Sequence, residues 1–265
     1  MNNSNIHIVG LGHLGTAFFE GLYSNIDESK IFLYDESRDR INFFKTNFEL
    51  TVNSEIKTIE QGILLLCIKP QNVSHFFEVN SSNIGPEVLI CSPVAGLEID
   101  KIESNYKNKI IRVMPNLLIG QNNGFIPYAK NYKEDYLNFE AKTLSSLGTI
   151  KEFNEQLFPV LTALSGSGPA WFYELSKSLV SAGVELGLRK DDADLLIKEL
   201  IKALPNLVNQ SDSFDSLVER VKSPNGTTEA GINSLIEDSF DKIIKNAIQK
   251  SSNRSIEISE ELKSE

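Results

Sequence analysis

The chain has 265 residues, with 41% hydrophobic and 23% charged side chains, a composition typical of a globular protein with a sizeable core. Its formal net charge of −10 repels phosphate backbones and anionic lipids, which makes nucleic acid and membrane surfaces poor candidate partners. No apolar run reaches the roughly 18 residues needed to span a bilayer, and the first residues lack the regions of a signal peptide. We therefore expect a cytoplasmic protein.

The first half of the chain alternates short apolar runs with helical stretches. The runs are bounded by turn residues, a pattern typical of buried parallel strands. They lie at residues 5–10, 31–35, 63–68, 88–91, 110–113 and 124–129. This alternation predicts an open, doubly wound sheet. Cys67 and Cys91 lie at the ends of two runs and form no CxxC pair, so we interpret them as small core residues.

The second half, from Glu155 onward, contains no convincing strand and is expected to be helical. Apolar residues recur there at spacings of three and four, for example from Ile232 to Ala247. Such stripes must pack against something, and a second subunit is a plausible partner. The segment 253–265 is polar, and we expect it to fray. The pattern therefore predicts a dinucleotide-binding domain at residues 1–154 and an all-helical domain at residues 155–265.

A glycine-rich turn separates the first predicted strand from the first predicted helix. It has the form GxGxxG, in the context that a dinucleotide-binding motif requires. Its residues are Gly10, Leu11, Gly12, His13, Leu14 and Gly15. The first glycine permits a tight turn, the second lets the backbone approach a pyrophosphate, and the third lets the helix pack closely. The alternative is a strand-to-helix turn that binds no ligand.

An acidic residue, Asp35, ends the second predicted strand, twenty residues after Gly15. A carboxylate at this position normally accepts hydrogen bonds from the ribose hydroxyls of NAD and repels a 2′-phosphate. Ser37 and Arg38 follow at once and are residues that bind such a phosphate. The segment therefore leaves the choice between NADH and NADPH open, and Asp35 can also be a turn or cap residue.

Three further segments combine small or polar residues with an element boundary. The first is CIKPQ, where Lys69 follows a strand that ends at the expected ligand crevice. The second is SGSGPA, with Ser165 and Gly166, and the third is SPNGTT, with Ser223 and Thr228. The last two precede predicted helices, so free N–H groups and hydroxyls there suit a carboxylate. Ordinary helix capping is the alternative for each.

Taken together, these segments resemble one family, the pyrroline-5-carboxylate reductases, which make proline. The resemblance runs nearly end to end and rests on IHIVGLGHLG, CIKPQ, RVMPN, TALSGSGPA, AGVELGL and SPNGTT, in this order. It implies a Rossmann domain followed by an all-α domain that interlocks with its twin in a homodimer, with larger homo-oligomers left open. It also implies hydride transfer from NADPH or NADH to the C=N carbon of a five-membered cyclic imino acid.

The resemblance also carries site roles onto matching positions. Thr228 matches the hydroxyl that binds the ring nitrogen and is the expected catalytic residue. The substrate contacts are Glu155, Ser165, Gly166, Ser223, Gly226, Thr227 and Thr228. The cofactor contacts are the glycine turn, Asp35, Ser37, Arg38, Asn53, Ile68, Lys69, Pro70, Ala95 and Asn116. No histidine clusters with Cys, Asp or Glu at metal spacing, so we expect no metal.

The chain departs from the family pattern at several loops. Leu117 and Leu118 follow RVMPN where Thr-Pro is usual, and Asn225 stands where glycine is usual. The family usually has a run of small residues after the fourth strand, and this chain has SPVAG at 92–96 instead. After the second strand the family often has Asn-Arg-Ser, and here the segment begins with Asp35. Two alternatives follow: a reductase of another cyclic imino acid, such as a six-membered ring, and a non-catalytic nucleotide-binding relative. Retention of Thr228 and of SGSGPA argues against the second.

Overall fold

The computed structural model describes residues 4–208 and 212–264, and the chain divides into two compact units. The first unit comprises Met1–Gly168 and Gln249–Glu265, and the second comprises Pro169–Ile248. The boundary expected between residues 154 and 155 therefore differs from the division by packing. Residues 155–168 and the end of the chain pack with the first unit.

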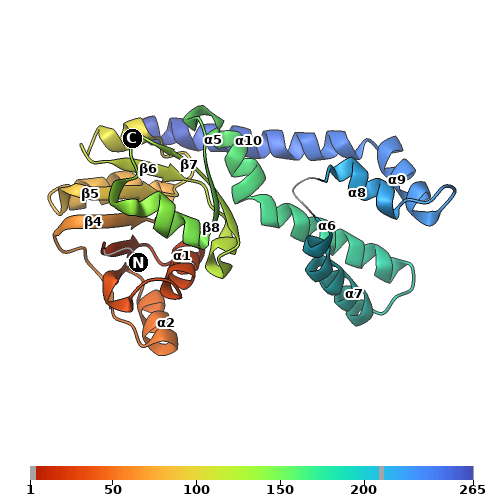
Figure 1. Cartoon of the computed structure of the whole chain (residues 1–265), viewed down its shortest axis with the longest axis horizontal. Helices are drawn as coiled ribbons and strands as arrows, with labels where there is room; N and C mark the ends of the chain where they lie inside the picture. Colours follow the sequence, from red (N-terminus) through yellow and green to blue (C-terminus); the bar gives the residue numbers. More distant parts are fainter. Residues whose placement is uncertain (1–3, 209–211, 265) are drawn as a thin grey trace. The chain divides into compact units, whose positions relative to one another are not determined.

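The first unit contains one sheet of eight strands (Figure 1). The strands are β1 Ile6–Val9, β2 Ile31–Tyr34, β3 Val52–Asn53, β4 Ile59–Leu66, β5 Ile84–Ser92, β6 Ile110–Val113, β7 Gly124–Lys130 and β8 Gly148–Glu152. Their order is β3-β2-β1-β4-β5-β6-β7-β8. Neighbours from β3 to β6 pair in parallel, and β7 runs antiparallel to β6. The predicted doubly wound sheet is thus confirmed, with β3 and β8 as strands that were not predicted.

Helices cover both faces of this sheet. They are α1 His13–Tyr23, α2 Arg38–Phe48, α3 Val73–Asn80, α4 Ile99–Glu103 and α5 Phe158–Leu161. On β4, Ile63 and Leu65 face the hydrophobic cluster that contains Phe18 of α1. Leu64 and Leu66 face the other cluster, which contains Phe76 of α3, because successive strand side chains point to opposite faces. Both faces of the sheet are therefore buried, which explains the continuous apolar run of this strand.

The remaining helices are α6 Gly168–Glu185, α7 Lys190–Ala203, α8 Phe214–Val221, α9 Thr227–Glu237 and α10 Phe240–Ser264. The described residues after Glu155 contain no strand, as predicted. Ser239 has a φ of +57° and separates α9 from α10, so the stripe from Ile232 to Ala247 spans two helices. No helix within residues 4–208 and 212–264 has the length and hydropathy of a membrane span.

The last turns of α10 belong to the first unit, and the expectation that residues 253–265 fray is wrong for residues 253–264. Ser252, Ser255, Ser259 and Leu262 are buried on one side of the helix. Ser259 donates a hydrogen bond to Glu98, and Lys263 forms an ion pair with the same carboxylate. Serines at spacings of three and four form a buried stripe there although the segment is polar in composition.

Candidate active site

The carboxyl ends of β1, β2, β3, β4, β5 and β6 meet at one edge of the sheet because these strands are parallel. The residues that follow them include the glycine turn, Asp35, Lys69, Ala95 and Asn116. The order β3-β2-β1-β4-β5-β6 reverses direction between β1 and β4, and ligands of doubly wound folds bind at such a switch point. The fold therefore gathers the predicted cofactor residues at the edge where a dinucleotide binds.

The glycine turn has the geometry of a pyrophosphate cradle. Gly10 has a φ of +87°, and a Cβ on Gly15 would lie 1.9 Å from the Gly10 oxygen, so neither position tolerates a side chain. A Cβ on Gly12 would meet nothing within 4 Å. Gly12 is also the N-cap of α1 and makes no side-chain cap hydrogen bond. The open helix N-terminus therefore offers N–H groups to an anion, which fits a dinucleotide.

The predicted ribose end of the site is built around Asp35. Its Oδ2 accepts a hydrogen bond from the Leu11 N–H at 2.6 Å, and its Oδ1 accepts one from the Ser37 N–H at 2.8 Å. Its own N–H donates to the Asn53 oxygen. Ser37 caps α2 through a hydrogen bond from the Arg40 N–H, and the Arg38 side chain is exposed. Two backbone N–H groups, one in the glycine turn and one before α2, thus fix the Asp35 carboxylate.

At the other end of the edge, the loop after β6 contacts the SGSG segment. Asn116 Nδ2 donates to the Ser165 oxygen at 3.2 Å. A Cβ on Gly166 would lie 3.2 Å from the Met114 sulfur, so this glycine allows the two loops to approach closely. Pro169 follows in the first turn of α6, where its fixed φ suits a helix start. The structure therefore brings Asn116, Ser165 and Gly166 together.

The loop after β4 completes this edge. Ile68 and Lys69 directly follow β4, and Pro70 begins a 3₁₀ turn. Lys69 is exposed, whereas Ile68 and Ala95 are half-buried. His13 and Leu14 begin α1, with His13 exposed. These side chains line the rim of the site edge rather than its core.

Glu155 lies beside the same edge and is held by an ion pair that sequence reasoning missed. Its Oε1 accepts from Arg112 Nη1 at 2.9 Å and from the Ile99 N–H at 2.9 Å. Arg112 is 2% exposed and lies over the Phe158 ring at 4.6 Å from its centroid. Burial lowers the pKa of Arg112, and the hydrogen bond to Glu155 opposes this shift. One feature of the sequence indicated that Arg112 needs a buried partner, because this arginine lies within an otherwise apolar strand.

The SPNGTT segment lies in the second unit, where it forms the turn before α9. The Gly226 N–H donates to the Ser223 oxygen at 2.9 Å, and Asn225 has a φ of +56°. Asparagine is among the non-glycine residues that best tolerate this left-handed conformation, which accounts for its place where glycine is usual. Thr227 and Thr228 then form the first turn of α9. Each hydroxyl therefore stands at a helix N-terminus.

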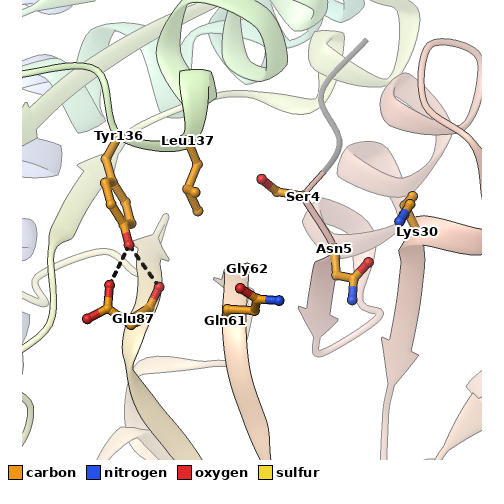
Figure 2. A pocket seen from close by; sticks show the side chains of 8 residues that line it. All are labelled: Ser4, Asn5, Lys30, Gln61, Gly62, Glu87, Tyr136 and Leu137. Atoms are coloured by element: carbon orange, nitrogen blue, oxygen red, sulfur yellow. Dashed lines mark hydrogen bonds between the residues drawn. The ribbon is translucent and has the colours of Figure 1, made fainter.

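A separate hollow of about 330 Å³ lies at the opposite edge of the sheet (Figure 2). Asn5 precedes β1, Lys30 precedes β2, and Gly62 lies early in β4, so this hollow is at the amino ends of the strands. Tyr136 donates to Glu87 across it. It contains none of the predicted site residues, and ligands of this fold bind at the carboxyl ends. Among the described residues, no group of three or more His, Cys, Asp or Glu is placed to hold a metal ion.

Comparisons with known proteins give one consistent family. A model of pyrroline-5-carboxylate reductase dimerisation matches residues 155–258. Pyrroline-5-carboxylate reductase 1 of Bacillus subtilis is 31% identical over 208 residues, covering 77% of this chain and 70% of that protein. The Staphylococcus epidermidis reductase is 27% identical over 260 residues, covering 94% and 96%.

Solved structures agree along the whole chain. The crystal structure of Plasmodium falciparum pyrroline carboxylate reductase with NADP bound has a TM-score of 0.85 at 28% identity, covering 98% of this chain and 99% of that chain. The Coxiella burnetii pyrroline-5-carboxylate reductase has a TM-score of 0.84 at 26% identity, covering 97% and 99%. The fold is therefore shared over nearly the full length.

Proposed function

The chain belongs to the pyrroline-5-carboxylate reductase family, and we infer that it reduces the C=N bond of 1-pyrroline-5-carboxylate to L-proline with NAD(P)H. The observation that carries this inference is the match to named reductases over 94% of the chain, with the glycine turn and SGSG loop at one sheet edge. The reaction is the last step of proline biosynthesis, and we assign it to the cytoplasm, where reduced dinucleotides are supplied.

The protein's task in this reaction is to position two rings and exclude water. When bound, the nicotinamide supplies the hydride. We propose that the N-terminus of α1 binds the pyrophosphate, with Gly12 leaving room for it. Lys69, Pro70 and Ala95 line the path along the edge, and Asn116 holds the SGSG loop beside it. No buried acid–base pair is needed, because the imine can be protonated before it reacts.

For the substrate, we propose that the turn before α9 binds the imino acid. Ser223, Gly226 and Thr227 hold its carboxylate through hydroxyl and N–H donors at the helix N-terminus. The Thr228 hydroxyl hydrogen-bonds the ring nitrogen. The family resemblance also assigns Glu155 to the substrate contacts, and its Oε1 accepts from Arg112 and from the Ile99 N–H. Ser165 and Gly166 complete the contact set.

We propose that the chain acts as a homodimer formed by residues 155–265, as the dimerisation model over residues 155–258 supports. Within the described part of the second unit, Ala193 and Ile197 are the only buried hydrophobic side chains. Phe172 and Ile236 are each 69% exposed. Apolar surface of this extent is covered in stable proteins, and a second copy of the same helices supplies the cover.

The test is oxidation of NADH and NADPH with 1-pyrroline-5-carboxylate, followed by chromatographic identification of the product. We expect proline to form in proportion to the dinucleotide oxidised. A parallel assay with the six-membered imine gives the ring-size preference. A folded oligomer that binds dinucleotide and reduces neither imine would overturn the proposed function.

Thr228→Ala separates the substrate role from the cofactor role. Loss of one hydrogen bond formed to the reacting ring should lower kcat/KM about 10- to 100-fold. Dinucleotide affinity should stay within about twofold, because the proposed cofactor contacts all lie in the first unit. Thr228→Ser keeps the hydroxyl and is the matched control. Wild-type turnover in Thr228→Ala would remove this residue from the mechanism.

A further inference from the structure

At the site edge, the Asp35 carboxylate accepts hydrogen bonds from backbone N–H groups that could otherwise bind an anion. The carboxylate accepts the Leu11 N–H of the glycine turn and the Ser37 N–H of the turn before α2. Backbone N–H groups at such turns are donors that a phosphate can use. A fixed carboxylate therefore already fills the place of an added anion.

Arg40, one of the two arginines that follow Asp35, points toward the glycine turn and the start of α1. Its Nε donates to the Leu11 oxygen at 2.6 Å, and its Nη2 donates to Thr16 Oγ1 at 2.6 Å. The guanidinium also lies over the Phe43 ring, 4.6 Å from its centroid. Two hydrogen bonds and one cation–π contact thus hold Arg40 against the protein.

Leu11 connects these two charged groups. Its N–H is held by Asp35 and its carbonyl by Arg40, while its side chain is fully buried. The peptide groups on both sides of Leu11 are thereby fixed between a carboxylate and a guanidinium. The position of Asp35 relative to the pyrophosphate cradle is set by this connection rather than by Asp35 alone.

We propose that Asp35 makes this chain selective for NADH over NADPH and that Arg40 is a positioning residue for the glycine turn. The proposal rests on the proposed function only in placing a nicotinamide dinucleotide at this edge. A ribose 2′-hydroxyl donates to a carboxylate, which has lone pairs beyond those used by the backbone. A 2′-phosphate would bring like charge against a carboxylate that cannot move away. Glu36, exposed beside Arg38, adds to the negative field.

The family accommodates the phosphorylated cofactor, since the Plasmodium falciparum reductase was solved with NADP bound. Selectivity in this chain must therefore come from local residues. The acid at the end of β2 and the two arginines that follow it make opposite predictions for NADPH. Arg40 is removed from this choice, because its hydrogen bonds turn its donors toward Leu11 and Thr16. Arg38 stays exposed, and in this proposal the fixed carboxylate of Asp35 outweighs it.

The test is direct binding of NADH and NADPH to the purified oligomer by titration calorimetry, without imine. We expect NADH to bind at least about tenfold more tightly, a difference of about 1.4 kcal/mol. Asp35→Ser and the isosteric Asp35→Asn should both reduce this ratio, mainly by strengthening NADPH binding. Asp39→Ser removes the same charge from the first turn of α2 and should leave the ratio within about twofold. Equal or tighter NADPH binding by the wild type, or an unchanged ratio in Asp35→Asn, would overturn the proposal.

Arg40→Gln tests the positioning role. Loss of its bonds to Leu11 and Thr16 should weaken NADH and NADPH by the same factor, about tenfold, and leave their ratio unchanged. A loss confined to NADPH would show that Arg40 binds the 2′-phosphate, which contradicts the proposal. Turnover is measured separately. Equal kcat/KM with both dinucleotides counts against the selectivity alone, whereas selective binding without imine reduction counts against the proposed function alone.

Discussion

His7 on β1 illustrates what a buried titratable residue contributes when it binds no ligand. Its ring is 7% exposed, stacks on Phe32 at 4.8 Å between centroids, and places Nδ1 3.1 Å from the Tyr34 hydroxyl. Burial lowers the pKa of His7 from 6.5 to about 4. The unfolded chain therefore binds a proton between these values that the folded chain does not. The stabilising contribution is complete above pH 6.5 and is lost as the pH falls through about 4.

His7→Phe should flatten the acid side of the stability profile. The pKa difference corresponds to about 3 kcal/mol, at about 1.4 kcal/mol per unit. We expect the wild type to lose up to this amount relative to His7→Phe between pH 7 and pH 4, measured by urea unfolding. At pH 7 the variant should be about 1 kcal/mol less stable, because Tyr34 loses its partner. Parallel pH profiles for the two proteins would show that folding does not lower the pKa of His7.

At this same scale, the sequence predicted backbone requirements better than side-chain partners. The need for glycine at residues 10 and 15 follows from the motif, and the geometry of both positions agrees with it. The bonds from Arg40 to Leu11, and from Arg112 to Glu155, join residues 29 and 43 positions apart. Such pairs depend on how the strands and helices pack. No local pattern in the sequence indicates them.

At the scale of elements, strands with an apolar run were predicted, and those without one were not. β8 has the sequence GTIKE and lies at the end of the sheet, so one apolar residue suffices for its single neighbour. β3 has only two residues, too few to form an apolar run.

The end of α10 was missed for a different reason. Its buried stripe is made of serines, whose small size lets the helix approach a loop closely.

Gly96 is the loop residue that this approach requires. It has a φ of +77°, and a Cβ there would lie 2.6 Å from Ile258 Cγ2 and 2.8 Å from the Ser259 nitrogen. Gly96→Ala should therefore destabilise the first unit by about 2–4 kcal/mol, from backbone strain and steric overlap together. Urea unfolding without nucleotide is the measurement.

Gly12→Ala is the matched control for this substitution. Its added Cβ meets nothing within 4 Å, so we expect less than about 0.5 kcal/mol of change in stability. The same variant should weaken dinucleotide binding, because the methyl group stands where the pyrophosphate is expected. A Gly96→Ala protein as stable as Gly12→Ala would mean that the end of α10 does not dock against this loop.

At the scale of the whole molecule, the two units differ in how their cores are made. The first has two large hydrophobic clusters, one on each face of the sheet. The described part of the second has only Ala193 and Ile197 buried among its hydrophobic residues, too few to stabilise helices of this length alone. The periodicity of the sequence indicated that these helices bury apolar stripes. It could not indicate that the chain itself leaves them uncovered.

The double variant Phe172→Asp/Ile236→Asp tests this dependence on a partner. Charges placed on the exposed apolar faces of α6 and α9 should prevent self-association, seen as halving of the mass by light scattering. Turnover should fall by at least about 100-fold, because the proposed substrate residues 223–228 lie in the unit whose fold we propose to depend on a partner. Dinucleotide binding should persist, since the glycine turn and Asp35 belong to the unit with its own core. Lys202→Glu changes the net charge by the same amount and replaces an exposed ion pair with Glu199 by a like-charge pair; it is the control and should stay associated and active. A monomeric double variant with full turnover would show that the second unit folds and acts without a partner.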